Sequence, residues 1–317
     1  KVNLPGFIPD TPGIRSNICD YLYEIQWADR HLGEMLDILE KSGELENTVV
    51  IVTSDNGMSF PGGKCNLYDQ GSRVPFAVRY PERIPAGRTV DDLITLADLH
   101  PTICGIAGVK PAAGISTKSI ENLLFSGKSG RLDPKRVFVV TTFEVHTIPY
   151  PMRALRDDRY LYIRNYEPER VKVPEVWKKK ASPSSERLVE GMQLGHRNYL
   201  TTFREDAEVR PYAARCFGKR PAEEIYDLKT DPFALVNLAG DPKMETLRKS
   251  MGRKLSAHLE ATGDPRHTDK PVEFQKYPLY TSPSFREENL ELVKKLKREQ
   301  KELLQAMAES RDIKNYK

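Results

Sequence analysis

Residues 49–81, VVIVTSDNGMSFPGGKCNLYDQGSRVPFAVRYP, begin as a run of β-branched residues and then place an acid, an amide, several glycines and a lysine in one loop. A near-continuous apolar run is typical of a strand that is covered on both faces, as in an α/β fold. In open α/β sheets, ligands bind at the carboxyl ends of the strands, where Asp55 and Asn56 stand. An Asp carboxylate beside an Asn carbonyl suits Ca²⁺ or Mg²⁺. For these residues alone, a turn that bonds only to its own backbone is the commoner arrangement.

The amino-acid composition limits the class of protein to which the chain can belong. The chain has 317 residues, 39% of them hydrophobic, which predicts a globular protein. Its net charge is only +4 and the charges of both signs are interspersed, so we expect no nucleic-acid partner. The sequence has no run of about 18 apolar residues, the length that would predict a membrane-spanning helix. The cysteines form no CxxC pair that would indicate zinc or a redox motif, and they leave disulfides and compartment open: Cys19, Cys65, Cys104 and Cys216.

Hydrophobic periodicity predicts the order of the elements. Apolar residues at helical spacing predict helices over residues 12–42, 95–108, from about 242 to 262, and 284–310. Strands are predicted over 47–55, 74–81, 136–146, 159–166 and from 223. The helix that begins near Pro242 carries an apolar stripe of Leu247, Met251, Leu255 and Leu259. Helix, short loop and buried strand together make an α/β unit.

Several motifs in sequence order resemble the sulfatase family of the alkaline-phosphatase superfamily. After SDNG (54–57) and a nearby lysine come RVP (73–75), IPAG (84–87), LADLHPTICGIAGVKP (96–111), YPMRALRDDRYLYIRNY (150–166) and EEIYDLKTDPFALVNLAGDP (223–242). The resemblance covers about residues 3–262. Through LPGFIPDTP (4–12), SFPGGKCNLYDQG (59–71) and YPMR (150–153) it is strongest to the sulfamidase branch, the heparan N-sulfatases that act on N-sulfoglucosamine.

The resemblance implies a fold and three domains. Residues 1–140 are expected to form the C-terminal part of a doubly wound, mostly parallel α/β sheet of the sulfatase type. Residues 141–265 are expected to form a smaller antiparallel sheet packed with a helix, and residues 266–317 an extended segment and a surface helix. Without further strands the larger sheet would keep an open edge, so we expect the chain alone to be unstable.

The resemblance also implies roles for single residues. Asp55 and Asn56 would be two ligands of one Ca²⁺, and Lys64 would contact the sulfate oxygens as a catalytic and substrate-binding cation. A solvated loop lysine is the alternative for Lys64. Arg73, before Val74-Pro75, is as well explained by bonds to loop carbonyls.

A second group of candidates lies in TFEVHTIPYPMR, residues 142–153. Glu144, His146 and Arg153 combine hydrogen-bond acceptors with cations, the mixture that a sugar carrying sulfate and carboxylate groups requires. We therefore expect these three residues to bind and select the substrate. For His146 a structural role is equally expected.

The chain departs from the family pattern at the nucleophile. None of the four cysteines lies in the C/S-x-P/A-x-R motif whose Cys or Ser becomes formylglycine, and the family's N-terminal Asp pair and Lys-x-His segment are also absent. We therefore expect a C-terminal part of a sulfatase that acts together with the N-terminal part of the same protein. Formylglycine and the other Ca²⁺ ligands would lie outside this sequence.

The function expected from the resemblance is hydrolysis of sulfuric esters or sulfamates on sulfated sugars, with N-sulfoglucosamine of heparan-type glycans as the leading substrate. The alternatives are an O-sulfatase, a phosphodiesterase of the superfamily, or a non-catalytic fragment or binding module. A homodimer is left open. Family members act in lysosomes, in the periplasm or outside the cell, and the residues do not choose among these.

Overall fold

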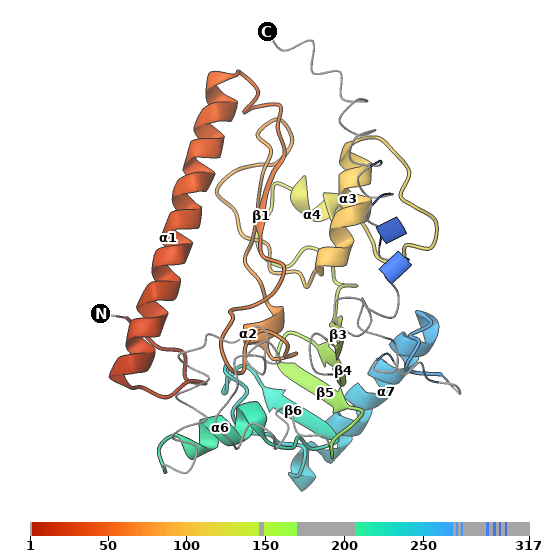
Figure 1. Cartoon of the computed structure of the whole chain (residues 1–317). Helices are drawn as coiled ribbons and strands as arrows, with labels where there is room; N and C mark the ends of the chain where they lie inside the picture. The colour runs from red at the N-terminus through yellow and green to blue at the C-terminus, as the bar shows by residue number, and fades with distance from the viewer. Residues whose placement is uncertain are drawn as a thin grey trace. The chain divides into compact units, whose positions relative to one another are not determined.

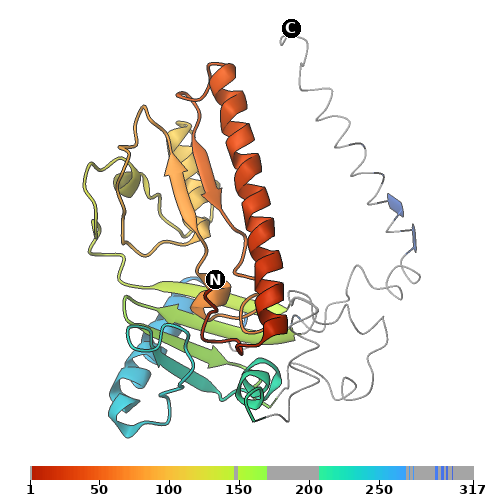
Figure 2. The ribbon, with the colours of Figure 1, turned by 90° about the vertical axis from the view of Figure 1, so that its left-hand side faces the viewer.

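A computed structural model describes residues 2–145, 149–169 and 207–268, together with residues 271, 274, 290, 291, 294, 295, 298 and 302. The chain divides into two compact units, residues 1–269 and 270–317. The predicted helix over 284–310 lies mostly outside the described residues. The predicted boundary at residue 140 falls within the first unit and stays a prediction. Figure 1 and Figure 2 show the elements of the first unit.

The first elements follow the predicted order. Helix α1 (Pro12–Lys41) begins at a Thr11 cap, whose side chain accepts a 3.4 Å hydrogen bond from the backbone of Ile14, and has Pro12 in its first turn. Strands β1 (Val50–Thr53) and β2 (Phe76–Arg79) follow. The shorter helices after β1 are α2 (Asp69–Ser72), η1 (Leu96–Asp98), α3 (Leu99–Ile106) and α4 (Glu121–Leu124).

The first strand pair runs antiparallel. We expected a mostly parallel sheet in this part of the fold, and the two strands that the described residues contribute to it, β1 and β2, pair antiparallel, with Ile51 opposite Val78. A parallel pair requires a crossover connection, usually through a helix of several turns. The connection between these strands instead turns back through a loop that contains only the four-residue helix α2.

The second half is a four-stranded antiparallel sheet in the order β3-β4-β5-β6. Its strands are β3 (Val139–Val145), β4 (Pro149–Arg156), β5 (Tyr160–Asn165) and β6 (Glu223–Asp227). Helix α6 (Arg210–Phe217) precedes β6, and η4 (Pro242–Met244) and α7 (Glu245–Ala261) follow it. The small antiparallel sheet with a helix is as predicted. Strand β4 and helix α6 were not predicted as elements.

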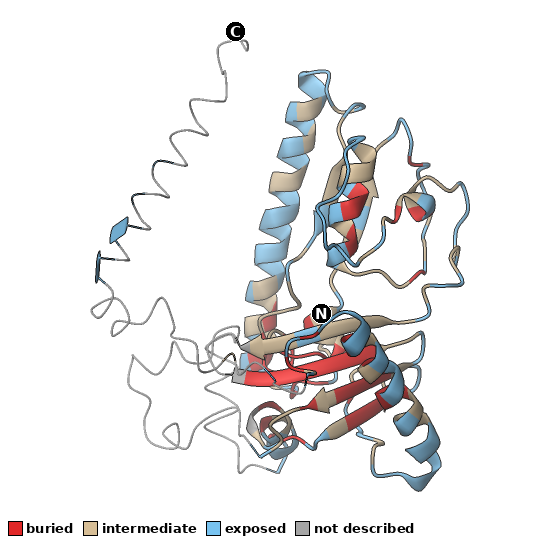
Figure 3. Cartoon of the chain, turned by 90° about the vertical axis from the view of Figure 1, so that its right-hand side faces the viewer, coloured by how far each residue is buried: buried red, intermediate tan, exposed pale blue. Residues whose placement is uncertain are grey.

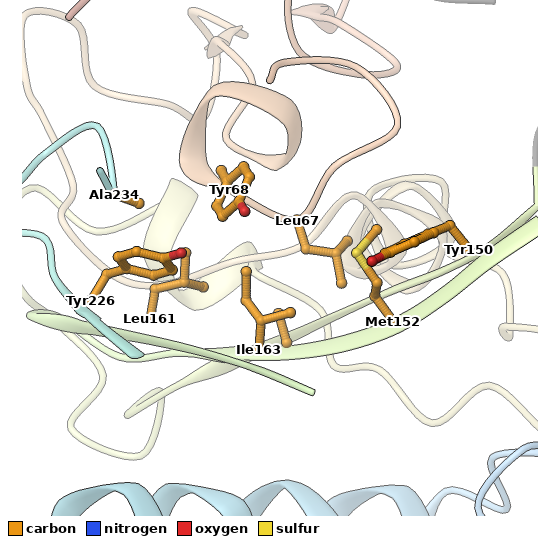
Figure 4. Close-up of a cluster of buried hydrophobic side chains, with 9 residues drawn as sticks. Leu67, Tyr68, Tyr150, Met152, Leu161, Ile163, Tyr226 and Ala234 are labelled. Atoms are coloured by element: carbon orange, nitrogen blue, oxygen red, sulfur yellow. The ribbon is translucent and has the colours of Figure 1, made fainter. Parts of the chain in front are cut away.

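The two faces of this sheet carry separate cores, since successive side chains of a strand point to opposite faces. The helix-side core packs α7 against the sheet and consists of Leu155, Tyr162, Ile225, Met251, Leu255 and Leu259. The loop-side core, drawn in Figure 4, consists of Leu67, Tyr68, Tyr150, Met152, Ala154, Leu161, Ile163, Tyr226 and Ala234. Leu67 and Tyr68 come from the loop between β1 and β2, so the loop-side core joins the two halves of the unit.

Helix α1 is buried only near its start. Ile14 and Ile18 are buried with Phe7, Ile8 and Phe60, whereas most of the helix is exposed, as Figure 3 shows. None of the helices in the described residues combines the length and apolar character that crossing a membrane would need.

Candidate functional site

The Asp55-Asn56 pair follows directly on β1. The Ser54 hydroxyl donates a 2.8 Å hydrogen bond to the carbonyl of Asn56, and the Asn56 amide nitrogen donates a 2.9 Å bond to the carbonyl of Gly57. The amide is thus held by the local backbone, as expected for a turn. Within the described residues, no hydrogen bond engages the Asp55 carboxylate or the Asn56 side-chain oxygen. Asp55 is exposed and Asn56 is half-buried, so both oxygens are available to an external ligand.

Residues 57–72, which we call the lysine loop, fold back tightly on themselves. The Gly57 N–H donates a 2.9 Å hydrogen bond to the carbonyl of Gly71. A Cβ atom at Gly57 would lie 1.9 Å from the Gln70 carbonyl oxygen, and one at Gly71 would lie 2.4 Å from the Asn66 carbonyl oxygen. Only glycine permits these approaches. The glycines of the motif are therefore required for the path of the loop.

Lys64 lies in this loop, close to the Asp-Asn pair along the chain. Its N–H donates a 2.8 Å hydrogen bond to the carbonyl of Met58, two residues after Asn56. Lys64 is half-buried, and within the described residues no carboxylate pairs with its ammonium group. A cation without an acidic partner is suited to bind an anion. The structure thus places Asp55, Asn56 and Lys64 in a single loop at the end of β1.

Arg73 follows the lysine loop. Its guanidinium lies 4.0 Å from the Asp69 carboxylate, and its side chain is 74% exposed. In the described part of the chain, that side chain makes no hydrogen bond to a loop carbonyl. The structural explanation offered for Arg73 therefore finds no support in this geometry.

A buried polar network fixes the lysine loop to the loop-side core. The Tyr68 hydroxyl donates a 2.9 Å hydrogen bond to Glu224, which also accepts hydrogen bonds from Tyr226 at 2.5 Å and from Asn165 at 2.7 Å. Burial, together with the nearby Glu224 charge, raises the pKa of Tyr68 to about 12. Tyr68 thus stays neutral and remains a donor to Glu224 at physiological pH. Sequence reasoning did not identify this network, because its members are far apart along the chain.

Glu144 and Arg153 belong to a different cluster. The β3–β4 pairing shifts register between Phe143 and Val145, so Glu144 lies at an irregularity of the strand ladder. The Arg153 side chain is 2% exposed; Nε lies 2.7 Å from Asp264, and Nη2 lies 3.0 Å from Asp264 and also contacts Glu144. Arg266 donates a 2.9 Å hydrogen bond to Glu144.

The remaining donors of Arg153 are also occupied. Its Nη1 donates to the carbonyls of Met152 at 2.9 Å and Phe143 at 3.3 Å. Burial acts to raise the pKa of Asp264, but the hydrogen bonds and charge of Arg153 outweigh it and lower that pKa. Every part of the guanidinium thus serves the fold, and a contact from Arg153 to substrate would break an existing bond.

Strand alternation separates the two groups of candidates. Met152 and Ala154 belong to the loop-side core, so Arg153 between them points to the side of α7. Asp264, its partner, follows α7. The structure therefore does not bring Arg153 to the face on which the lysine loop packs. Glu144 keeps 19% side-chain exposure, and its contact with substrate stays a prediction. His146 lies outside the described residues.

The donor set at β1 fits a hard cation only in part. A carboxylate and an amide oxygen are suitable ligands for Ca²⁺, which takes six to eight oxygens. Among the described residues, no three His, Cys, Asp or Glu side chains are grouped closely enough to hold a metal ion. Asp55 and Asn56 could therefore supply a minority of the ligands of a Ca²⁺ ion.

Comparisons with known proteins relate the chain to sulfatases. The sulfatase family model matches residues 6–109, and the model of the C-terminal region of N-sulphoglucosamine sulphohydrolase matches residues 63–193. An ulvan-active sulfatase of Formosa agariphila is 28% identical over 83% of this chain and 41% of its own length. Human N-sulphoglucosamine sulphohydrolase is 28% identical over 83% of this chain and 52% of its own length. The chain thus spans about half the length of these curated relatives, or somewhat less.

Solved structures show the same fold. A protein in complex with its substrate D-glucosamine-2-N,6-O-disulfate matches with a TM-score of 0.57 and 22% identity, over 79% of this chain and 42% of its own. A protein from Bacteroides fragilis described as a sulfatase matches with a TM-score of 0.58 and 22% identity, over 82% of this chain and 47% of its own. These likenesses show that the chain shares the fold of these proteins, and the two family models relate residues 6–193 to sulfatases.

Proposed function

We propose that the gene product carrying this chain hydrolyses sulfated sugars, with N-sulfoglucosamine as its leading substrate. The observation that carries the proposal is the placement of Asp55, Asn56 and Lys64 in one loop at the end of β1, with the Asp55 carboxylate and the Lys64 ammonium unpaired within the described residues. Oxygen ligands for a cation and a free ammonium are the groups needed to hold a sulfate group.

Each residue has a part in this proposal. Asp55 and Asn56 would hold Ca²⁺, which supplies positive charge to polarise the sulfate oxygens. Lys64 would contact a sulfate oxygen and stabilise the negative charge of the sulfuryl group while it is transferred from the sugar to the nucleophile. The nucleophile would be the family's formylglycine, from a Cys or Ser outside this sequence. Lys64 lies on the lysine loop, which buried contacts hold in place, so its charge needs little reorganisation during the reaction.

Calcium binding can be tested without turnover. We expect the full-length gene product to bind Ca²⁺ with a calorimetric signal that Asp55→Ala weakens by at least about tenfold, since one charged ligand of the ion is lost. Asp10→Ala is the matched control, because Asp10 is an exposed carboxylate whose partner is Arg15, at 2.6 Å. Equal Ca²⁺ affinity in the two variants would contradict the assignment of Asp55.

Exposed apolar side chains along α1 support a polypeptide partner. Its large apolar residues include Leu22, Ile25, Trp27, Met35 and Ile38, which are 43–65% exposed, and Val52 of β1 is 37% exposed. Several exposed large apolar side chains on one helix favour an interaction site. We assign it to the N-terminal part of a sulfatase domain. Charged substitutions such as Ile38→Glu should lower the soluble yield or the thermal stability of the full-length product, whereas Val109→Glu, on an exposed loop outside α1, should not.

The relatives favour a second candidate substrate class. Ulvan-active sulfatases and N-acetylglucosamine-6-O-sulfatase of Bacteroides thetaiotaomicron are among the similar proteins, so O-sulfated sugars compete with N-sulfoglucosamine. Release of inorganic sulfate from N-sulfoglucosamine and from glucosamine-6-O-sulfate, measured side by side, distinguishes the two. Release from the O-sulfated sugar alone would replace the N-sulfate proposal. Hydrolysis of phosphodiesters without sulfate release would favour the phosphodiesterase alternative.

A further inference from the structure

Two buried side chains connect Lys64 to the small sheet. Asn66 is 3% exposed, and its side-chain nitrogen lies 3.1 Å from the carbonyl oxygens of both Gly63 and Lys64. Arg220, which precedes β6 and is 5% exposed, donates from Nη2 to the Asn66 side-chain oxygen. An uninterrupted chain of hydrogen bonds therefore leads from Arg220 through Asn66 to the backbone of Lys64.

The direction of these bonds is fixed by chemistry. A guanidinium can only donate, so the Asn66 oxygen must face Arg220 and its NH₂ group must face the two carbonyls. Cys65, which lies between Lys64 and Asn66, has a φ of +63°. Residues other than glycine rarely adopt this left-handed conformation. The bonds from Asn66 to the preceding carbonyls stabilise this turn. Arg220 thus selects the one amide orientation that holds the turn.

Arg220 is itself held by aromatic and sulfur contacts. Its guanidinium carbon lies 5.1 Å from the centre of the Tyr68 ring and 5.2 Å from that of Tyr150, and Nη1 lies 3.1 Å from the Met152 sulfur. Burial acts to lower its pKa, but neighbouring acidic groups, among them the Glu224 carboxylate, outweigh burial and raise that pKa, so the group stays charged. A buried, charged and stacked guanidinium is a rigid anchor.

We propose that Asn66 and Arg220 are positioning residues for Lys64: they orient its backbone and so aim its ammonium group at an anion. The identity of the anion as a sulfate group rests on the proposed function, whereas the positioning of Lys64 does not. Removing the anchor should loosen the turn and weaken anion binding by about tenfold, the lower end of the losses seen when supporting residues of a site are removed.

The test uses the full-length gene product with the variants Arg220→Met, Arg220→Lys and Asn66→Asp. Arg164→Met is the matched control, because Arg164 lies on β5 and donates to α7 on the other face, at 3.1 Å to Ser256 and 3.2 Å to the Gly252 carbonyl. The first readout is hydrogen exchange of residues 63–66. The second is acetylation of Lys64 by an amine reagent, titrated with inorganic sulfate.

We expect Arg220→Met and Asn66→Asp to speed exchange of residues 63–66 and to raise the sulfate concentration that protects Lys64 by about tenfold. Arg220→Lys should recover part of both effects, since lysine can still donate to Asn66, and Arg164→Met should change neither. Equal exchange of residues 63–66 in Arg220→Met and Arg164→Met would overturn the inference. If sulfate fails to protect Lys64 in the unmodified protein, the proposed anion fails, while the exchange result still decides the positioning.

Discussion

Replacing Arg153 by methionine separates a structural role from a substrate-binding one. The side chain is 2% exposed and bonds to Asp264 and Glu144 as well as to two backbone carbonyls. Removing one partner of a buried ion pair costs about 3–5 kcal/mol, because it leaves an uncompensated buried charge, here mainly that of Asp264. This is a large share of the roughly 5–15 kcal/mol that stabilises most domains.

The assay is urea unfolding of the full-length gene product, followed by tryptophan fluorescence and circular dichroism. With a dependence of about 3 kcal/mol per molar urea, the midpoint of Arg153→Met should fall by about 1–2 M. Arg159→Met is the control. Arg159 pairs with Asp227 at 2.6 Å, but its side chain is 52% exposed, so its loss should cost about 1 kcal/mol or less.

A compensating change sharpens this prediction. Arg153→Met combined with Asp264→Leu removes both buried charges and should recover at least about 1 kcal/mol relative to the single variant. If Arg153→Met changes stability no more than Arg159→Met while it abolishes binding of a sulfated sugar, the structural assignment is refuted and Arg153 returns to the substrate site.

Three further predictions concern the same unit. Gly57→Ala should destabilise the protein by about 3 kcal/mol, because the added Cβ would meet a backbone oxygen at 1.9 Å. Gly33→Ala in α1, which has open space around it, should be neutral or stabilising. Equal shifts of the melting temperature in the two variants would contradict this. Tyr68→Phe should cost about 1–2 kcal/mol in urea unfolding by removing a donor to buried Glu224, and no loss would contradict the network. The folded-state pKa of Asp264 lies below its ordinary value of 3.8, so its ion pair stabilises the folded protein above that pH and is lost as the pH falls further. The difference in unfolding free energy between wild type and Asp264→Asn should therefore shrink below about pH 4. A constant difference from pH 6 to pH 3 would count against this.

Local patterns predicted most of the fold. The stripe of α7 was identified from its spacing, and Met251, Leu255 and Leu259 are buried against the sheet. The antiparallel pairing of β1 with β2 was not predicted, because a run of buried β-branched residues indicates coverage on both faces but not the direction of the neighbouring strand. Strand β4 was missed in PYPMRALR, where two prolines obscure the alternation.

The sequence also predicted the candidate site only in part. Asp55, Asn56 and Lys64 are close in sequence, so a motif could group them. Arg153 and Glu144 were grouped as substrate-binding candidates; in the structure Arg153 pairs with Asp264, 111 residues away, and Glu144 with Arg266, 122 residues away. A mixture of acids and cations looks the same in sequence whether it binds a sugar or pairs with itself, and only the fold shows that these charges are paired.

Release of inorganic sulfate from N-sulfoglucosamine by the full-length gene product tests the proposed function most directly. Peptide mapping of the same sample should first establish that formylglycine is present. The account predicts sulfate release that is lost in Asp55→Ala and reduced in Lys64→Ala, with Asp10→Ala unchanged. A formylglycine-containing protein that releases no sulfate from N- or O-sulfated glucosamine, or that releases it equally well without Asp55 and Lys64, would contradict it.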